Sequence, residues 1–182
     1  ADLADVRALL TSDQTSVRLV LTPEAVVAAE TRRTLTSLAL YGYRADGPVA
    51  NRVLPASRDP WMTGWVDAQT AQLAAVRADV APLTVRESPY AAAEPVGVEA
   101  LQAIADALYA DNDPLEVVDV AELVTVDRDS DGFLLSVALP LARLEDLDLA
   151  RSGDELVMTV LGHRRLLALP SALRRCDIAG AR

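Results

Sequence analysis

Lysine is absent from this sequence, and all 17 of its basic residues are arginine. The absence excludes chemistry that requires a lysine side chain, such as Schiff-base formation or phosphate binding by the lysine of a P-loop. Cysteine occurs once, at Cys176. One cysteine cannot form an internal disulfide or an all-cysteine metal site, and its scarcity is typical of a reducing compartment. We therefore expect a cytoplasmic protein.

Positive charge and long hydrophobic runs are also scarce. The 27 acidic residues outnumber the basic ones, and the formal net charge is -10. A surface of this sign repels duplex nucleic acid and anionic membranes, so neither is an expected partner. No apolar run has the length of a membrane span, and the residues after Ala1 do not resemble a signal peptide, so no direct membrane insertion is expected. The 182 residues, 51% of them hydrophobic, suffice for one sizeable domain or two small ones.

Strand and helix patterns alternate in the first half of the chain. An apolar run over residues 17–21 precedes an amphipathic helix that ends at Gly42, and a second apolar run follows over 48–54. This spacing is typical of a βαβ crossover, which joins two parallel strands. Two more helices and a short strand over 83–86 continue the pattern. Residues 1–110 therefore predict an α/β fold with a partial, doubly wound parallel sheet, as in half of a larger domain whose earlier strands lie outside this chain.

The hydrophobic period changes to alternation in the second half of the chain. Residues 111–114 have the composition of a linker. Apolar residues then alternate with polar ones in several short segments, and Gly162 marks a hairpin turn. A last edge strand is expected over 176–178. Residues 111–182 therefore predict a small antiparallel β-sandwich as a second domain.

Polar residues stand at the carboxyl ends of the first two predicted strands. Thr22-Pro23-Glu24 follows the first strand, and Asn51-Arg52 closes the second. Ligands of parallel α/β sheets bind beyond these strand ends, so we expect the polar residues to face a nucleotide. A simpler interpretation is that Asn51 caps its strand through ordinary turn chemistry. Taken alone, the pattern favours the simpler interpretation.

Three segments of the first half resemble the C-terminal part of the ATPase domain of the ArsA family. This family includes arsenite-pump ATPases and ATPases that target tail-anchored membrane proteins. The segments are TPEAVVAAETRR (22–33), VANRV (49–53) and SPYAAAEPVGVEAL (88–101). In the second half, GDELVMTVLGHRRLLALP (153–170) is similar to the α-crystallin-type domain of small heat-shock proteins. The two resemblances occur in the order found in some bacterial ArsA-like proteins.

The ArsA resemblance implies a role for four residues. It implies that Asn51 contacts the adenine ring of ATP or ADP, and that a loop with Pro89 and Tyr90 closes over the base. A side-chain amide offers a base edge both a donor and an acceptor, and a proline-aromatic loop is a stiff apolar wall. Arg52 is included as a further nucleotide-binding residue. Glu24 and Glu30 match acidic positions of the family motif but receive no role.

The same resemblance implies that the phosphates and Mg²⁺ are held by an N-terminal P-loop half of the same protein. We assign no catalytic residue to this chain and do not expect it to hydrolyse ATP alone. The resemblance leaves a homodimer open, but a zinc-clasped dimer is not expected because residues 57–62 contain no cysteine. The alternative function is a non-catalytic interaction module whose β domain binds an extended partner segment at a sheet edge.

One match to a metal-binding pattern does not predict a metal site. Asp127, Asp129, Asp131 and Gly132 fit the opening of a calcium loop. However, Ala138 stands where the bidentate glutamate is due, and the flanking residues have strand patterns. An acidic turn is the better interpretation, so no metal ligand is predicted.

Overall fold

The computed structural model describes residues 2–115, 124–130 and 132–180. Within these residues the chain divides into two compact units. We name residues 2–32 and 44–115 the α/β unit, and residues 33–43, 124–130 and 132–180 the β unit. The helix that follows the first strand contributes residues to both. The predicted domain boundary between residues 110 and 111 stays a prediction.

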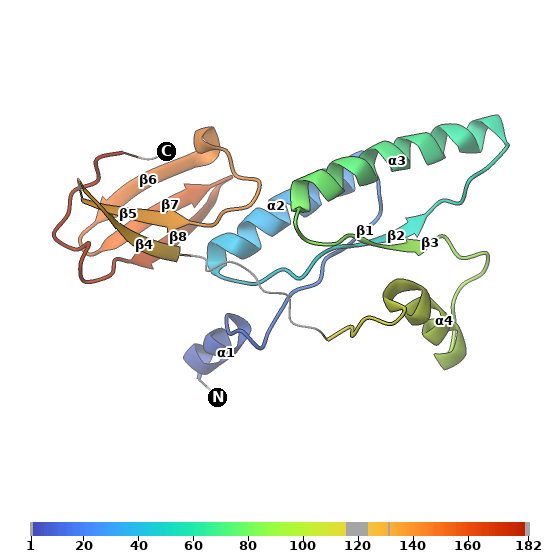
Figure 1. Ribbon diagram of the computed structural model, residues 1–182, viewed down its shortest axis with the longest axis horizontal. Helices are drawn as coiled ribbons and strands as arrows, with labels where there is room; N and C mark the ends of the chain where they lie inside the picture. The colour runs from blue at the N-terminus through green and yellow to red at the C-terminus, as the bar shows by residue number, and fades with distance from the viewer. Residues whose placement is uncertain (1, 116–123, 131, 181–182) are drawn as a thin grey trace. The chain divides into compact units, whose positions relative to one another are not determined.

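The α/β unit contains a parallel sheet of three strands in the order β1-β2-β3. Val20 of β1 pairs with Val49 of β2, and Val49 pairs in turn with Arg86 of β3. Figure 1 shows helix α3 on one side of these strands and helix α4 on the other. The predicted α/β class with a partial parallel sheet is confirmed. The elements are α1 (Leu3–Leu10), β1 (Val20–Leu21), α2 (Ala25–Tyr41), β2 (Val49–Val53), α3 (Pro60–Val80), β3 (Arg86–Pro89) and α4 (Val98–Tyr109).

Helix boundaries follow local sequence signals. Asp59 accepts hydrogen bonds from the backbone N–H groups of Trp61 and Met62, and Pro60 occupies the first helical position of α3, where its missing N–H costs nothing. Helix α2 ends at Tyr41, and Gly42 follows with φ 87°, the left-handed conformation that glycine adopts most easily.

The third strand differs from its predicted position. It begins at Arg86 instead of ending there. The N–H of Leu83 donates to the carbonyl of Val80 in the turn that ends α3, so the residues directly after the helix are not available to the sheet ladder. The shift brings Ser88 and Pro89 into the strand.

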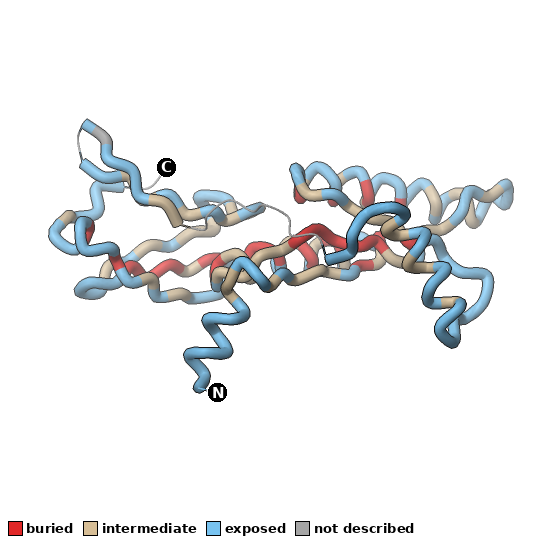
Figure 2. Tube along the Cα trace, turned by 60° about the horizontal axis from the view of Figure 1, so that its bottom comes forward, coloured by how far each residue is buried: buried red, intermediate tan, exposed pale blue. Residues whose placement is uncertain are grey.

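The core of the α/β unit lies between the sheet and helix α3. Leu21 and Ala50 are buried on the strands. The buried residues of α3 recur at helical spacing and form one stripe, as expected for a helix packed on a sheet. They are Gln69, Leu73, Val76 and Val80. Helix α1 is exposed along its whole length and is drawn pale blue in Figure 2.

The β unit contains two antiparallel sheets, one of β4 and β5 and one in the order β6-β7-β8. The predicted β-sandwich is confirmed. The sequence patterns did not predict strand β6, because aspartate, which this strand contains, is a poor strand former. Cys176–Ile178, expected as an edge strand, belongs to no strand. The elements are β4 (Val124–Asp129), β5 (Gly132–Val137), η1 (Leu144–Asp146), β6 (Leu147–Ser152), β7 (Glu155–Val160) and β8 (His163–Ala168).

A residue of helix α2 completes the core of the β unit. The side chain of Leu40 is fully buried there. The Thr36 hydroxyl donates to the carbonyl of Pro140 at 2.8 Å, and the Tyr41 hydroxyl donates to the carbonyl of Arg164 at 3.2 Å. The other buried members of the cluster are Leu156, Met158, Val160, Leu169 and Leu173.

Among the described residues, no helix combines the length and the apolar character needed to cross a membrane.

Candidate functional site at the carboxyl ends of β2 and β3

The structure brings the four predicted site residues to one edge of the parallel sheet. Val53, the last residue of β2, pairs with Pro89, the last residue of β3. The N–H of Tyr90 donates to the carbonyl of Val53 at 2.8 Å. Asn51 and Arg52 therefore lie on the strand next to the one that carries Pro89 and Tyr90. In parallel α/β sheets this is the edge at which ligands bind.

Strand β2 is irregular at Asn51 and Arg52. The strand register shifts between Ala50 and Val53, and Arg52 has φ 59°, in the left-handed region. The Oδ1 atom of Asn51 accepts a hydrogen bond from the N–H of Arg52 at 2.9 Å. A left-handed arginine costs about 1–2 kcal/mol. Strand irregularities of this kind are enriched beside active sites, where they redirect side chains.

Gln69 of helix α3 holds the irregular end of β2 in place. Its Oε1 atom accepts from the N–H of Leu54 at 2.9 Å, and its Nε2 atom donates to the carbonyl of Arg52 at 3.4 Å. Gln69 is only 8% exposed. The sequence analysis missed this residue, although a glutamine in the apolar stripe of a helix was a usable signal.

The side chains at this edge are accessible. Tyr90 is 54% exposed, Arg52 and Pro89 are also exposed, and Asn51 is half-buried. Within the described part of the chain, no residue accepts a hydrogen bond from Nδ2 of Asn51 and no carboxylate pairs with Arg52. An amide and a guanidinium therefore remain for a ligand.

The acidic residues of the first motif lie close to the start of helix α2. Glu24 precedes the helix, and its carbonyl accepts from the N–H of Ala28. Glu24 and Glu30 are both exposed. Neither receives a role from this arrangement.

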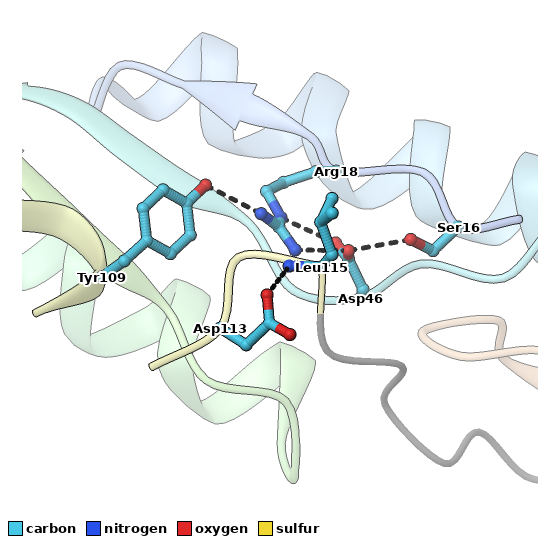
Figure 3. Close-up of polar contacts among 6 residues, drawn as sticks. All are labelled: Ser16, Arg18, Asp46, Tyr109, Asp113 and Leu115. Carbon is cyan, nitrogen blue, oxygen red and sulfur yellow. Dashed lines mark hydrogen bonds and ion pairs between the residues drawn. The ribbon is translucent and has the colours of Figure 1, made fainter. Parts of the chain in front are cut away.

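A second polar cluster lies before the amino ends of the strands (Figure 3). Arg18 donates to Asp46 through Nε at 3.1 Å and Nη2 at 2.6 Å, and Ser16 donates to the same carboxylate at 2.9 Å. Nη1 of Arg18 donates to the Tyr109 hydroxyl at 2.7 Å. Asp46 is 5% exposed. The hydrogen bonds to Asp46 raise the pKa of Arg18, so the guanidinium stays charged.

The chemistry of the carboxyl edge suits recognition of a planar base. It offers one amide, an aromatic ring and an exposed guanidinium. Over residues 2–115, 124–130 and 132–180, no group of three histidine, cysteine or acidic side chains is arranged to hold a metal ion.

A parallel α/β sheet followed by a small antiparallel β unit is the architecture of a partial P-loop-type domain joined to an HSP20-like domain. The family model of the anion-transporting ATPases matches residues 1–110, and the model of the HSP20-like domain found in ArsA matches residues 130–182. The chain belongs to the anion-transporting ATPase family, and the ArsA resemblance seen in the sequence is confirmed.

Relatives agree with this membership. A protein of Prosthecochloris vibrioformis named "Putative arsenical pump-driving ATPase" is 30% identical over 174 residues, which cover 94% of this chain and 43% of the relative. An uncharacterised protein of Streptomyces coelicolor is 38% identical over 184 residues, covering 99% of this chain and 45% of the relative. The chain thus spans less than half the length of these relatives.

Proposed function

We propose that this chain supplies the adenine-binding side of the nucleotide site of an ArsA-like ATPase. The observation that carries the proposal is the strand irregularity at Asn51 and Arg52, which lies beside Pro89 and Tyr90 at the carboxyl edge of a parallel sheet. Strain at a strand end is retained where it serves a site. Membership of the anion-transporting ATPase family adds the ligand class.

Each side chain has a role that its chemistry supports. The amide of Asn51 donates from Nδ2 to an acceptor on the adenine edge. Pro89 and the half-exposed ring of Tyr90 cover one face of the base. Arg52, which has no carboxylate partner among the described residues, binds an oxygen of the ribose or of a phosphate.

In this proposal the phosphates and Mg²⁺ are bound by another part of the protein. This chain has no lysine and so lacks the residue with which a P-loop holds the β- and γ-phosphates. We propose that an N-terminal P-loop half of the same protein, within the length that the relatives have beyond the match, holds them. The chain alone then binds nucleotide weakly and does not hydrolyse it.

An NMR titration of the 182-residue chain with ADP and with GDP tests this proposal. ADP is expected to shift the amide signals of residues 51–54 and 88–91 at millimolar concentration, and GDP to shift them less because its base presents a different edge. Asn51→Ala is expected to weaken the ADP response at least threefold, and Gln14→Ala, at an exposed amide in the loop after helix α1, to leave it unchanged. An ADP response that Asn51→Ala does not alter would overturn the proposal.

A second candidate function is that of an interaction module whose β unit binds an extended partner segment. It is favoured by large apolar side chains on the strands of this unit, since Phe133 is 42% and Leu166 51% exposed. The chain would then suppress aggregation of an unfolded client protein. Phe133→Ser and Leu166→Ser are expected to weaken that suppression, and Leu3→Ser, on the exposed helix α1, to leave it intact. Equal suppression by all three variants would reject this candidate.

A further inference from the structure

Most of the partly buried surface of helix α4 lies in its second half. None of its residues is buried, and of its five half-buried residues one, Ala100, is near the start, whereas the other four, Ile104, Ala105, Leu108 and Tyr109, lie in the second half. The connection from β3 to this helix, residues 90–97, is exposed throughout. That connection begins with Tyr90, one of the proposed base-binding residues. The position of α4 therefore determines where the far end of the segment lies.

Tyr109, the last residue of α4, is held by two arginines. The guanidinium carbons of Arg18 and Arg86 lie 5.4 and 5.3 Å from the centre of its ring. The Tyr109 hydroxyl also accepts the hydrogen bond from Arg18. Arg18 is in turn fixed by the buried carboxylate of Asp46 (Figure 3). Contacts between a cation and an aromatic face are attractive, and two of them on one ring restrain it strongly.

We call the cluster of Arg18, Asp46, Arg86 and Tyr109 the clamp. Arg86 connects the clamp to the candidate site. It is the first residue of β3, and its N–H donates to the carbonyl of Pro48 at 3.1 Å. The other end of this four-residue strand is Pro89. Tyr109 thus contacts the start of the same strand whose end carries the proposed base wall, and it also closes the helix that follows that wall.

We infer that Arg18, Asp46, Arg86 and Tyr109 are positioning residues for the base-binding segment 89–97. The clamp holds the start of β3 and the end of α4. The strand leads into the segment and the helix leads out of it, so the clamp positions the segment through these two elements. A fixed segment presents Pro89 and Tyr90 to the base without first having to be ordered, which lowers the entropic cost of binding. This inference rests on the proposed nucleotide function.

The clamp is tested by three variants of Tyr109. Tyr109→Ala removes the ring and the hydroxyl, and Tyr109→Leu keeps apolar bulk but removes both cation–π contacts. Tyr109→Phe keeps the ring and its contacts with both arginines but removes the hydroxyl. The readouts are the Kd values for ADP and GDP in the NMR titration, and amide hydrogen exchange over residues 90–97. Tyr41→Ala, in the β unit, is the control for loss of a tyrosine elsewhere.

A positioning role predicts a change in base selectivity as well as in affinity. Tyr109→Ala and Tyr109→Leu are expected to raise the Kd for ADP about three- to tenfold, to lower the preference for ADP over GDP, and to speed exchange over 90–97. Tyr109→Phe and Tyr41→Ala are expected to stay within twofold of the unaltered chain. Tyr109→Leu keeps the test decisive if the alanine variant does not fold.

The two failures are distinguishable. If the unaltered chain prefers ADP and both Tyr109→Ala and Tyr109→Leu keep that preference, the clamp inference is wrong and the proposed function stands. If these variants weaken ADP and GDP binding equally, their effect is a general loss of stability, and the inference is again wrong. If the unaltered chain prefers neither nucleotide, the proposed function fails and this inference fails with it.

Discussion

The carbonyl of Leu40 accepts a hydrogen bond from the guanidinium of Arg165 on strand β8, and the Leu40 side chain is fully buried in the core of the β unit. The last turns of helix α2 are therefore part of this unit, although they precede its strands by more than 80 residues in the sequence. A domain this small buries a limited fraction of its surface on folding, so each fully buried side chain such as Leu40 contributes appreciably to its core.

Leu40→Ala is expected to destabilise the β unit by about 2–5 kcal/mol, because it leaves a cavity in a core that cannot fully collapse. Hydrogen exchange of the amides of β7 measures this loss. Leu166→Ala, at a half-exposed leucine of β8, is the matched control and is expected to cost less than about 1 kcal/mol. Equal exchange rates in the two variants would show that Leu40 does not belong to the core.

Gln69→Ala is expected to destabilise the α/β unit by about 1–3 kcal/mol, since it leaves the N–H of Leu54 and the carbonyl of Arg52 without their partner. Chemical denaturation followed by circular dichroism measures the change. Gln72→Ala, three residues along the same helix, has the same intrinsic helix propensity and no hydrogen bond to β2. A similar loss in both variants would contradict the assigned role of Gln69.

Arg52→Gly is expected to leave stability unchanged or raise it by up to about 1 kcal/mol, because glycine adopts the left-handed conformation without steric cost. Arg52→Val is expected to lower stability, since a β-branched residue is poorly tolerated at positive φ. Thermal unfolding of the two variants provides the comparison. The reverse order would mean that the arginine side chain, and not its backbone, is what stabilises the strand end.

Two glycines predict opposite effects of the same substitution. Gly64 lies inside helix α3 with open space around an added Cβ, so Gly64→Ala is expected to stabilise the α/β unit by about 0.5–1 kcal/mol. Gly47 has φ +110°, and an added Cβ would lie 2.6 Å from the carbonyl oxygen of Thr84. Gly47→Ala is therefore expected to destabilise by at least about 1 kcal/mol. The two midpoints of denaturation must move in opposite directions.

Local signals in the sequence were sufficient for the major elements. The apolar periodicity and the caps of α3, and the glycine after α2, are properties of a few neighbouring residues, so they can be read without a structure. The carboxyl-end location of Asn51 and Tyr90 also followed, because the parallel order of the strands implies it. Strand β6 and the start of β3 did not, since tertiary pairing overrode weak local preferences.

The residues that hold the candidate site in place could not be predicted from neighbouring residues in the sequence. Arg18 and Tyr109 are separated by 91 residues, and Leu54 and Gln69 by 15. The identity of Arg52 does not predict a left-handed backbone, because among common residues only glycine, asparagine and aspartate adopt that conformation often.

The sequence by itself determined which elements form, which family the chain resembles and which strand ends carry polar side chains, since each of these depends on spacing along the chain. Only the tertiary structure decided that Leu40 of helix α2 belongs to the core of the β unit, that Gln69 is bonded to an irregular strand end, and that two arginines contact the ring of Tyr109. Those facts depend on contacts between residues far apart in sequence, and such contacts exist only once the chain has folded.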